Sequence, residues 1–103
     1  MGNLLIYLKI YGTDNGDIIA MCDQSLIDKV IEEGKIVLDI KRYAGFYKGS
    51  LIKKEEFQKG SRKVASVNIV GGESVAAAIE NMLIDESHVK IIAGIPYAHA
   101  YRV

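Results

Sequence analysis

The chain has 103 residues, half of them hydrophobic, with 13 basic and 13 acidic side chains. This length and balance predict one globular domain over residues 1–103, and they exclude a disordered tail or a strongly basic protein. The single cysteine, Cys22, excludes an internal disulfide, and no Cys/His cluster suggests zinc, so we expect no metal and no cofactor. Residues 1–11 lack the features of a signal peptide and no apolar run is long enough for a membrane span, so we predict a cytoplasmic protein without membrane association.

The first part of the chain predicts a β-hairpin followed by a helix. Apolar residues alternate with other residues in Leu4–Tyr11, and Asp17–Cys22 returns as a second strand after an Asn-Gly turn. The stretch Leu26–Glu33 predicts a helix that Asp23 or Ser25 caps and Gly34 ends. Lys35–Ile40 then predicts a third strand.

The rest of the chain predicts alternating strands and helices. Its predicted elements are an irregular aromatic loop at Lys41–Ser50, a short helix at Leu51–Lys59, a strand at Val64–Val70, an amphipathic helix at Glu73–Leu83, and strands at Val89–Ala93 and Ala98–Val103. This order predicts an α+β fold: a single domain with a mixed, mostly antiparallel sheet, an N-terminal β-hairpin and two or three helices packed on the sheet. We expect these helices to cover one face of the sheet.

The charges are unevenly distributed along the chain. Residues Lys35–Lys63 carry nine basic and three acidic side chains, whereas the remainder carries four basic and ten acidic ones. Phosphates require positive charge and unstacked bases pack on aromatic rings, so this segment is a candidate RNA-binding surface. The alternative is a solvated face whose aromatic residues, Phe57 above all, pack inward. The RNA-binding candidates are Lys41, Arg42, Tyr43, Tyr47, Lys48, Lys53, Lys54, Lys59, Arg62 and Lys63.

The turn at Gly71-Gly72 joins a predicted strand to a predicted helix. Backbone N–H groups at such a helix start can hold an anion, but the turn matches neither a P-loop nor GxGxxG. A tight structural turn is the alternative, with Glu73 stabilising the helix start. Together with the Gly94–His99 segment, the turn defines a candidate ligand or anion site. Its residues are Asn68, Gly71, Gly72, Ser74, Gly94, Tyr97 and His99.

No arrangement of side chains points to catalysis. His88 and His99 are the two histidines, and neither belongs to a recognisable triad or to a metal-ligand spacing. Cys22 is interpreted as a small core residue rather than as a nucleophile. We therefore assign no catalytic residues, and these patterns favour a protein that is not an enzyme while leaving an enzyme as the alternative.

A family pattern runs through most of the chain. It comprises Ala20–Asp23, Gly45–Gly49, Asn68–Gly71, Ser74-Val75, Ala78-Ile79, Leu83-Ile84, Val89, Gly94–Pro96 and Ala98. In these residues the sequence resembles a family of small archaeal proteins known as domain of unknown function 424. The resemblance implies an archaeal, cytoplasmic, stand-alone α+β domain and supplies no activity, cofactor or catalytic residue. It also implies a translation setting, because genes of the family lie near translation genes.

Three functions are compatible with these patterns. The first is a non-catalytic accessory protein of translation that binds RNA or a ribonucleoprotein. The second is a small-ligand or anion-binding domain, or an enzyme, built on the Gly71-Gly72 turn and the Gly94–His99 loop. The third is a protein–protein adaptor or a homodimer that pairs through an edge of the first or last strand.

Overall fold

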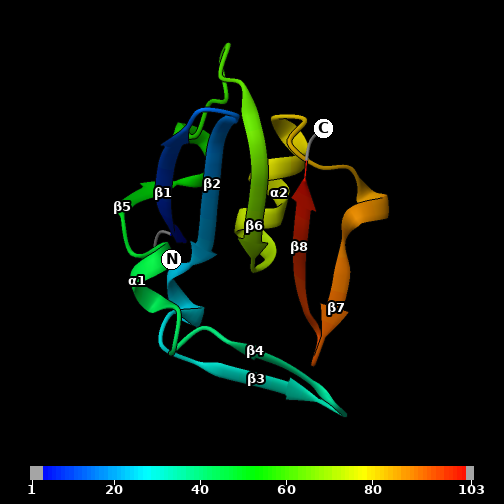
Figure 1. Ribbon diagram of the computed structural model, residues 1–103. Coiled ribbons are helices and arrows are strands. Elements are labelled where there is room, and N and C mark those ends of the chain that lie inside the picture. Colours follow the sequence, from blue (N-terminus) through cyan, green and yellow to red (C-terminus); the bar gives the residue numbers. More distant parts are fainter. Residues whose placement is uncertain (1–3, 102–103) are drawn as a thin grey trace.

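A computed structural model describes residues 4–101. Within this range a mixed sheet has the strand order β5-β1-β2-β6-β8-β7, and β3 and β4 form a separate two-stranded sheet (Figure 1). The strands are β1 (Leu5–Thr13), β2 (Gly16–Asp23), β3 (Val30–Glu33), β4 (Ile36–Asp39), β5 (Ser50–Lys53), β6 (Val64–Val70), β7 (Lys90–Ile92) and β8 (Ile95–Tyr101). The helices are α1 (Ala44–Tyr47) and α2 (Gly72–Glu80), with short 3₁₀ turns at η1 (Gln24–Leu26), η2 (Lys54–Glu56) and η3 (Glu86–His88).

The predicted α+β class and the N-terminal hairpin are confirmed. β1 and β2 pair in antiparallel register through a turn at Asp14-Asn15, and the single parallel contact in the described sheet joins β2 to β6. The strand predicted at Val64–Val70 is confirmed, and the amphipathic helix forms over Gly72–Glu80. The last strand begins at Ile95, earlier than expected. Residues 1–3, 102 and 103 of the predicted terminal segments lie outside the described residues.

Two of the predicted helices are wrong. Leu26–Glu33 contains only the end of η1, and then β3, which pairs with β4 through the two-residue turn Gly34-Lys35. The β-branched residues Val30 and Ile31 favour a strand, and antiparallel pairing supplies their backbone hydrogen bonds. Leu51–Lys59 begins as β5 on the edge of the main sheet instead of as a helix. The predicted loop Lys41–Ser50 contains the one-turn helix α1.

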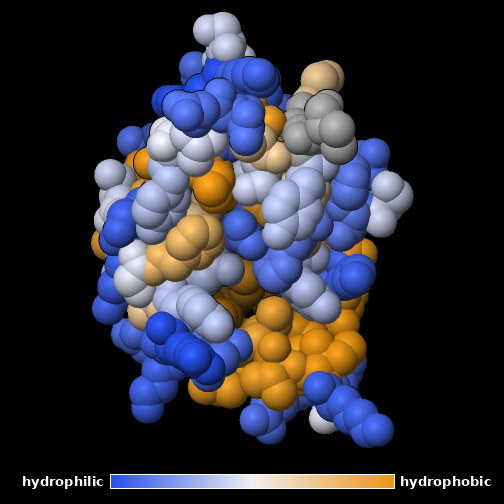
Figure 2. All heavy atoms as spheres, viewed as in Figure 1, coloured by the Kyte–Doolittle hydropathy of each residue, from blue (hydrophilic) through white to orange (hydrophobic). Residues whose placement is uncertain are grey.

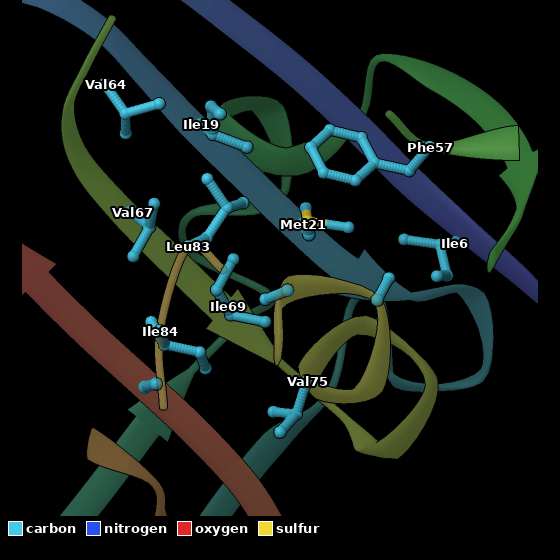
Figure 3. Close-up of a cluster of buried hydrophobic side chains, with 13 residues drawn as sticks. Ile6, Ile19, Met21, Phe57, Val64, Val67, Ile69, Val75, Leu83 and Ile84 are labelled. Atoms are coloured by element: carbon cyan, nitrogen blue, oxygen red, sulfur yellow. The ribbon is translucent and has the colours of Figure 1, made fainter. Parts of the chain in front are cut away.

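The core lies on both faces of the sheet. On one face, alternate residues of β1, β2 and β6 pack against α2 and Phe57, which is buried as predicted; Figure 3 shows Ile6, Ile19, Met21 and Ile69 among these side chains. The other face carries Ala20, Cys22 and Val70, packed under α1 and the β3–β4 hairpin. The expectation that helices cover only one face is therefore wrong, because α1 and the hairpin cover part of the second face.

Candidate nucleic-acid interface

The half-covered face of the sheet is the face opposite α2. α1 packs on its β1 side, where the Tyr11 hydroxyl donates a hydrogen bond to the Phe46 carbonyl at 2.8 Å and the two rings stack at 5.2 Å. Figure 1 shows α2 behind the sheet and no helix in front of β6 and β8. On this side Val70 of β6 is buried under the hairpin and Tyr97 of β8 packs against the same cluster, whereas Asn68 is half-buried and His99 and Tyr101 are exposed.

Three side chains of β8 form a row on this open face. Side chains two residues apart on a strand point to the same face, which places Tyr97, His99 and Tyr101 together, while Ala98 is buried on the α2 side. The rings of Tyr97 and His99 meet edge to face at 5.9 Å. Tyr101, at the end of the row, is 86% exposed. An exposed row of rings on a sheet is a stacking platform for unpaired bases.

Polar groups flank this row on both neighbouring strands. Asn68 of β6 lies opposite His99, and Lys90 of β7 lies opposite Tyr97. Within residues 4–101, the Asn68 amide has no hydrogen-bond partner, so its donors and acceptor are available.

Loss of solvent around the imidazole ring of His99, and secondly the charge of Lys90, lower the pKa of His99 below its usual value. The ring is therefore neutral near pH 7. We call Asn68, Lys90, Tyr97, His99 and Tyr101 the open-face patch.

A basic hollow adjoins the Tyr101 end of the patch. It has a volume of about 720 Å³ and is lined by Asn15, Lys59, Arg62, Lys63, Val64, Ala65 and Tyr101. Arg62 already lies 3.4 Å from the carboxylate of Asp17, whereas Lys59 and Lys63 make no ion pair within the described residues. Positive charge next to exposed rings is the combination that single-stranded nucleic acid requires.

The predicted basic segment does not form one continuous surface. Tyr47 is buried, Lys48 pairs with Asp28 at 3.3 Å, and Lys54 lies within 4 Å of Glu73 and Glu80. Lys53 lies on β5, at the far edge of the sheet from β8. Two parts of the segment remain near the open face. Tyr43, which follows Lys41 and Arg42 after β4, lines a hollow with His99, and Lys59, Arg62 and Lys63 before β6 line the basic hollow with Tyr101.

A smaller hollow separates the β3–β4 hairpin from the open face. It has a volume of about 170 Å³, and Tyr43, Tyr47, Val70 and His99 are among its lining residues. Figure 2 shows this hollow between the hairpin and the sheet. Burial, and secondly Cys22, raise the pKa of Tyr47 to about 12, so its hydroxyl stays neutral. The Lys41–Tyr43 end of the basic segment therefore reaches the patch through Tyr43.

The Gly71-Gly72 turn holds a carboxylate of the protein itself. The backbone N–H groups of Glu73 and Ser74 donate to Asp23 at 3.1 and 2.8 Å, and the Ser74 hydroxyl donates to Asp23 at 2.7 Å. The position predicted for an external anion is thus occupied by Asp23, and an external anion there stays a prediction that requires its displacement. Asp23 was expected to cap the next helix in sequence, but it caps α2 instead.

The turn and the Gly94–His99 segment are neighbours in space. The N–H of Gly71 donates to the Pro96 carbonyl at 2.8 Å, while Gly94 forms the β7–β8 turn. Of the predicted ligand residues, the sheet places Asn68, Tyr97 and His99 together on the open face. Gly71, Gly72 and Ser74 surround Asp23 instead. Sequence reasoning missed Lys90 and Tyr101, although the spacing of Tyr97, His99 and Tyr101 carries the two-residue period of a strand face.

Two further expectations concern chemistry and membranes. Cys22 is buried as predicted, and burial, with a smaller effect from Asp23, raises the pKa of its thiol to about 12. In residues 4–101, the acidic, histidine and cysteine side chains form no group of three able to hold a metal ion. Across the same range, no helix has both the length and the apolar character required to cross a membrane.

Fold and site together define a single α+β unit with a half-covered mixed sheet and an aromatic, polar open face. The family model for the protein of unknown function DUF424 matches residues 11–103, and the chain belongs to this family. Its fold is similar to that of an uncharacterized conserved protein from Methanopyrus kandleri, with a TM-score of 0.71 and 21% identity over 94% of this chain and 90% of the other. No curated protein matches the sequence.

Proposed function

We propose that this protein is a non-catalytic accessory protein that binds single-stranded RNA, alone or within a ribonucleoprotein, on the open-face patch. The observation that carries the proposal is the row Tyr97–His99–Tyr101 on β8, which ends at the basic hollow. The rings supply stacking surfaces, and the hollow supplies charges for the phosphates that connect the stacked bases.

The dimensions of the row suit a short stretch of nucleotides. From Tyr97 to Tyr101 the strand advances about 13 Å, at roughly 3.3 Å per residue. An exposed sheet with a few aromatic residues stacks two or three bases in well-known RNA-binding domains. Beside the rings, the free amide of Asn68 offers both a donor and an acceptor to a base edge. The translation setting and the archaeal, cytoplasmic origin implied by the family resemblance agree with this role.

The balanced net charge is compatible with weak, local binding. The 13 acidic side chains offset the 13 basic ones, so attraction at long range is small. Affinity must therefore come from a few direct contacts, with Lys59, Lys63 and Lys90 facing phosphates and the rings facing bases. Such a surface binds with modest salt dependence, about −0.7 in the logarithmic slope for each phosphate neutralised on a single strand.

A fluorescence anisotropy titration tests the proposal. The probe is a labelled single-stranded RNA pool of random sequence in about 50 mM salt, and we expect saturable binding that weakens as salt is added. Tyr101→Ala removes one stacking ring, so we expect a loss of about fivefold or more, since each stacked base contributes roughly 1–3 kcal/mol. The double change Lys59→Ala and Lys63→Ala is expected to lower the salt slope by about 1.4.

Matched controls separate this patch from other surfaces. Leu51→Ala removes an exposed apolar side chain on β5, at the edge of the sheet far from β8, and Lys29→Ala with Lys35→Ala removes two charges on the hairpin side. Both control variants should bind like the unchanged protein. Equal losses for Leu51→Ala and Tyr101→Ala would show that binding is not confined to the open-face patch. Absence of salt-sensitive binding to the pool would overturn the proposal.

A further inference from the structure

The β3–β4 hairpin carries the most prominent apolar surface near the end of the sheet. Val30, Ile36, Val37 and, on the neighbouring edge strand β7, Ile91 are each about half exposed. Figure 2 shows a continuous apolar area over the hairpin and the adjoining end of β7, and Figure 1 shows the hairpin extending past the lower ends of β2 and β6. Contiguous apolar surface rimmed by charge marks an interaction site.

One edge of this hairpin is open for strand pairing. β4 pairs with β3 on one side, and within residues 4–101 no strand pairs with its other side, where Val37, Leu38 and Asp39 line the hollow that faces the sheet. The Asp39 carbonyl already accepts from the Tyr43 N–H at 3.3 Å, so the unpaired backbone groups are those around Val37. In a hairpin with a two-residue turn, the flanking pair Glu33–Ile36 exchanges both hydrogen bonds, and the pattern then alternates. The N–H and C=O groups of Val37 therefore point away from β3, toward the open edge.

The sequence of this edge is complementary to itself. Lys35-Ile36-Val37-Leu38-Asp39 has a positive charge at one end, a negative charge at the other and apolar residues between. When two copies run antiparallel with Val37 opposite Val37, each Lys35 lies opposite the other copy's Asp39, and each Ile36 lies opposite Leu38. Lys35 makes no ion pair within residues 4–101, so it is available for this contact. Opposite charges facing each other across strands stabilise the pair.

We propose that the β4 edge is a self-association surface, and that its partner is a second copy of this chain. The two hairpins join into one four-stranded antiparallel sheet about a two-fold axis at Val37. This interface differs from the homodimer expected from the sequence, which pairs through the first or last strand. Within the described residues, β5 already pairs with Leu5–Leu8 of β1 and β7 with Ile95–Tyr97 of β8, so only the remaining part of each strand has an unpaired edge. The charge pairing favours a second copy over an unrelated peptide, because the chain itself carries both halves of the match.

The interface is small, so association is expected to be weak and concentration-dependent. Stable complexes bury at least about 1,000 Å² in total, and one pair of four-residue strands with a few apolar side chains lies near or below that limit. Sedimentation velocity of the whole chain from about 0.01 to about 1 mM measures it. We expect a shift from monomer to dimer within this range.

Charge reversal tests the register as well as the surface. Lys35→Glu sets two carboxylates opposite each other, and Asp39→Lys sets two ammonium groups opposite each other, so each variant alone is expected to stay monomeric. In an equimolar mixture, the antiparallel register sets the carboxylate introduced by Lys35→Glu opposite the ammonium group introduced by Asp39→Lys. It also sets the unchanged Asp39 of the first variant opposite the unchanged Lys35 of the second. The mixture is therefore expected to dimerise again.

Two further variants keep the test independent of folding defects. Asp39 also accepts a hydrogen bond from the Arg42 N–H at 2.9 Å, so circular dichroism must show that Asp39→Lys remains folded. Val37→Lys places a charge on the two-fold axis and is expected to abolish the dimer, whereas Leu51→Lys, on the far side of the sheet, should leave it intact. A monomer at every concentration, or a dimer that ignores Val37→Lys and the charge reversals, would overturn the proposal.

Discussion

The carboxylate of Asp23 and the backbone of Ser74 are joined by a 2.8 Å hydrogen bond, although 51 residues separate them in the chain. The same carboxylate also accepts from the Ser74 hydroxyl and from the Glu73 N–H. The end of β2 thus provides the N-terminal cap of α2, because the parallel pairing of β2 with β6 places Cys22 beside Val70. This long-range cap fixes α2 against the sheet and leaves the opposite face open.

Removing the cap is expected to destabilise the fold. Asp23→Ala leaves two helix N–H groups and the buried Ser74 hydroxyl without their acceptor. We expect the free energy of unfolding to fall by about 1–2 kcal/mol, the usual effect of losing a cap, or more because three donors are involved. Urea unfolding measures the change. Asp14→Ala, in the exposed first hairpin turn, is the matched control and should change stability by less than about 0.5 kcal/mol.

Two adjacent glycines are expected to respond in opposite ways to alanine. Gly71 has φ +106°, and a Cβ there would lie 2.3 Å from the Asp23 carboxyl carbon. Gly71→Ala therefore combines backbone strain with displacement of the cap, and we expect a loss of at least about 2 kcal/mol. Gly72 starts the helix and has open space around it, so Gly72→Ala should be neutral or stabilising by up to about 1 kcal/mol. Thermal unfolding of the two variants compares them directly, and similar losses would show that the clash at Gly71 is relieved.

The thiol of Cys22 is expected to resist modification in the folded protein. The side chain is fully buried, and its pKa of about 12 keeps the reactive thiolate scarce at pH 8. A thiol-reactive disulfide reagent should label native protein at least about a hundredfold more slowly than protein in denaturant. Asp23→Ala should speed labelling of the native protein, since a less stable fold opens more often. Fast labelling of the folded, unchanged chain would contradict the burial of this strand end.

RNA binding is expected to strengthen as the pH falls. The pKa of His99 lies below its usual value in the free protein, so the ring is neutral at pH 7.5. A nearby phosphate stabilises the charged ring and raises this pKa in the complex, so binding takes up a proton and tightens between about pH 7.5 and pH 5.5. NMR titration of the two histidines with and without RNA follows the shift, and His88, in η3, is the internal reference. His99→Gln should bind with little dependence on pH in this range.

His99 also makes the free energy of unfolding of the RNA-free protein depend on pH. Because the pKa of His99 is lower in the folded state than in the unfolded state, the unfolded chain takes up the proton first. The contribution of His99 to stability is therefore complete above about pH 6.5 and decreases as the pH falls below that value. Urea unfolding of the unchanged protein and of His99→Gln should diverge in that acidic range. Parallel curves would show that the ring titrates alike in both states.

Local patterns were enough to predict much of the main sheet. The alternation in β1 and β6, the Asn-Gly sequence at the first hairpin turn and the stripe of α2 are local features, so the N-terminal hairpin, the central strand and the main helix follow from them. The inward packing of Phe57 and the inert core position of Cys22 followed in the same way, because strongly apolar residues inside regular elements are usually buried.

Tertiary structure alone decided the two features on which the proposals depend. The sequence by itself determined an α+β unit of the DUF424 family, with a basic middle segment. It did not determine that Val30 and Ile31 form a hairpin rather than a helix, because a short apolar stretch suits either state until a partner strand completes its hydrogen bonds. Nor did it place Asn68 beside His99 and Tyr101 beside Lys63, since strand order joins residues that lie far apart in the chain. Only the tertiary structure shows that α2 packs on one face of the sheet and that the other face is covered in part.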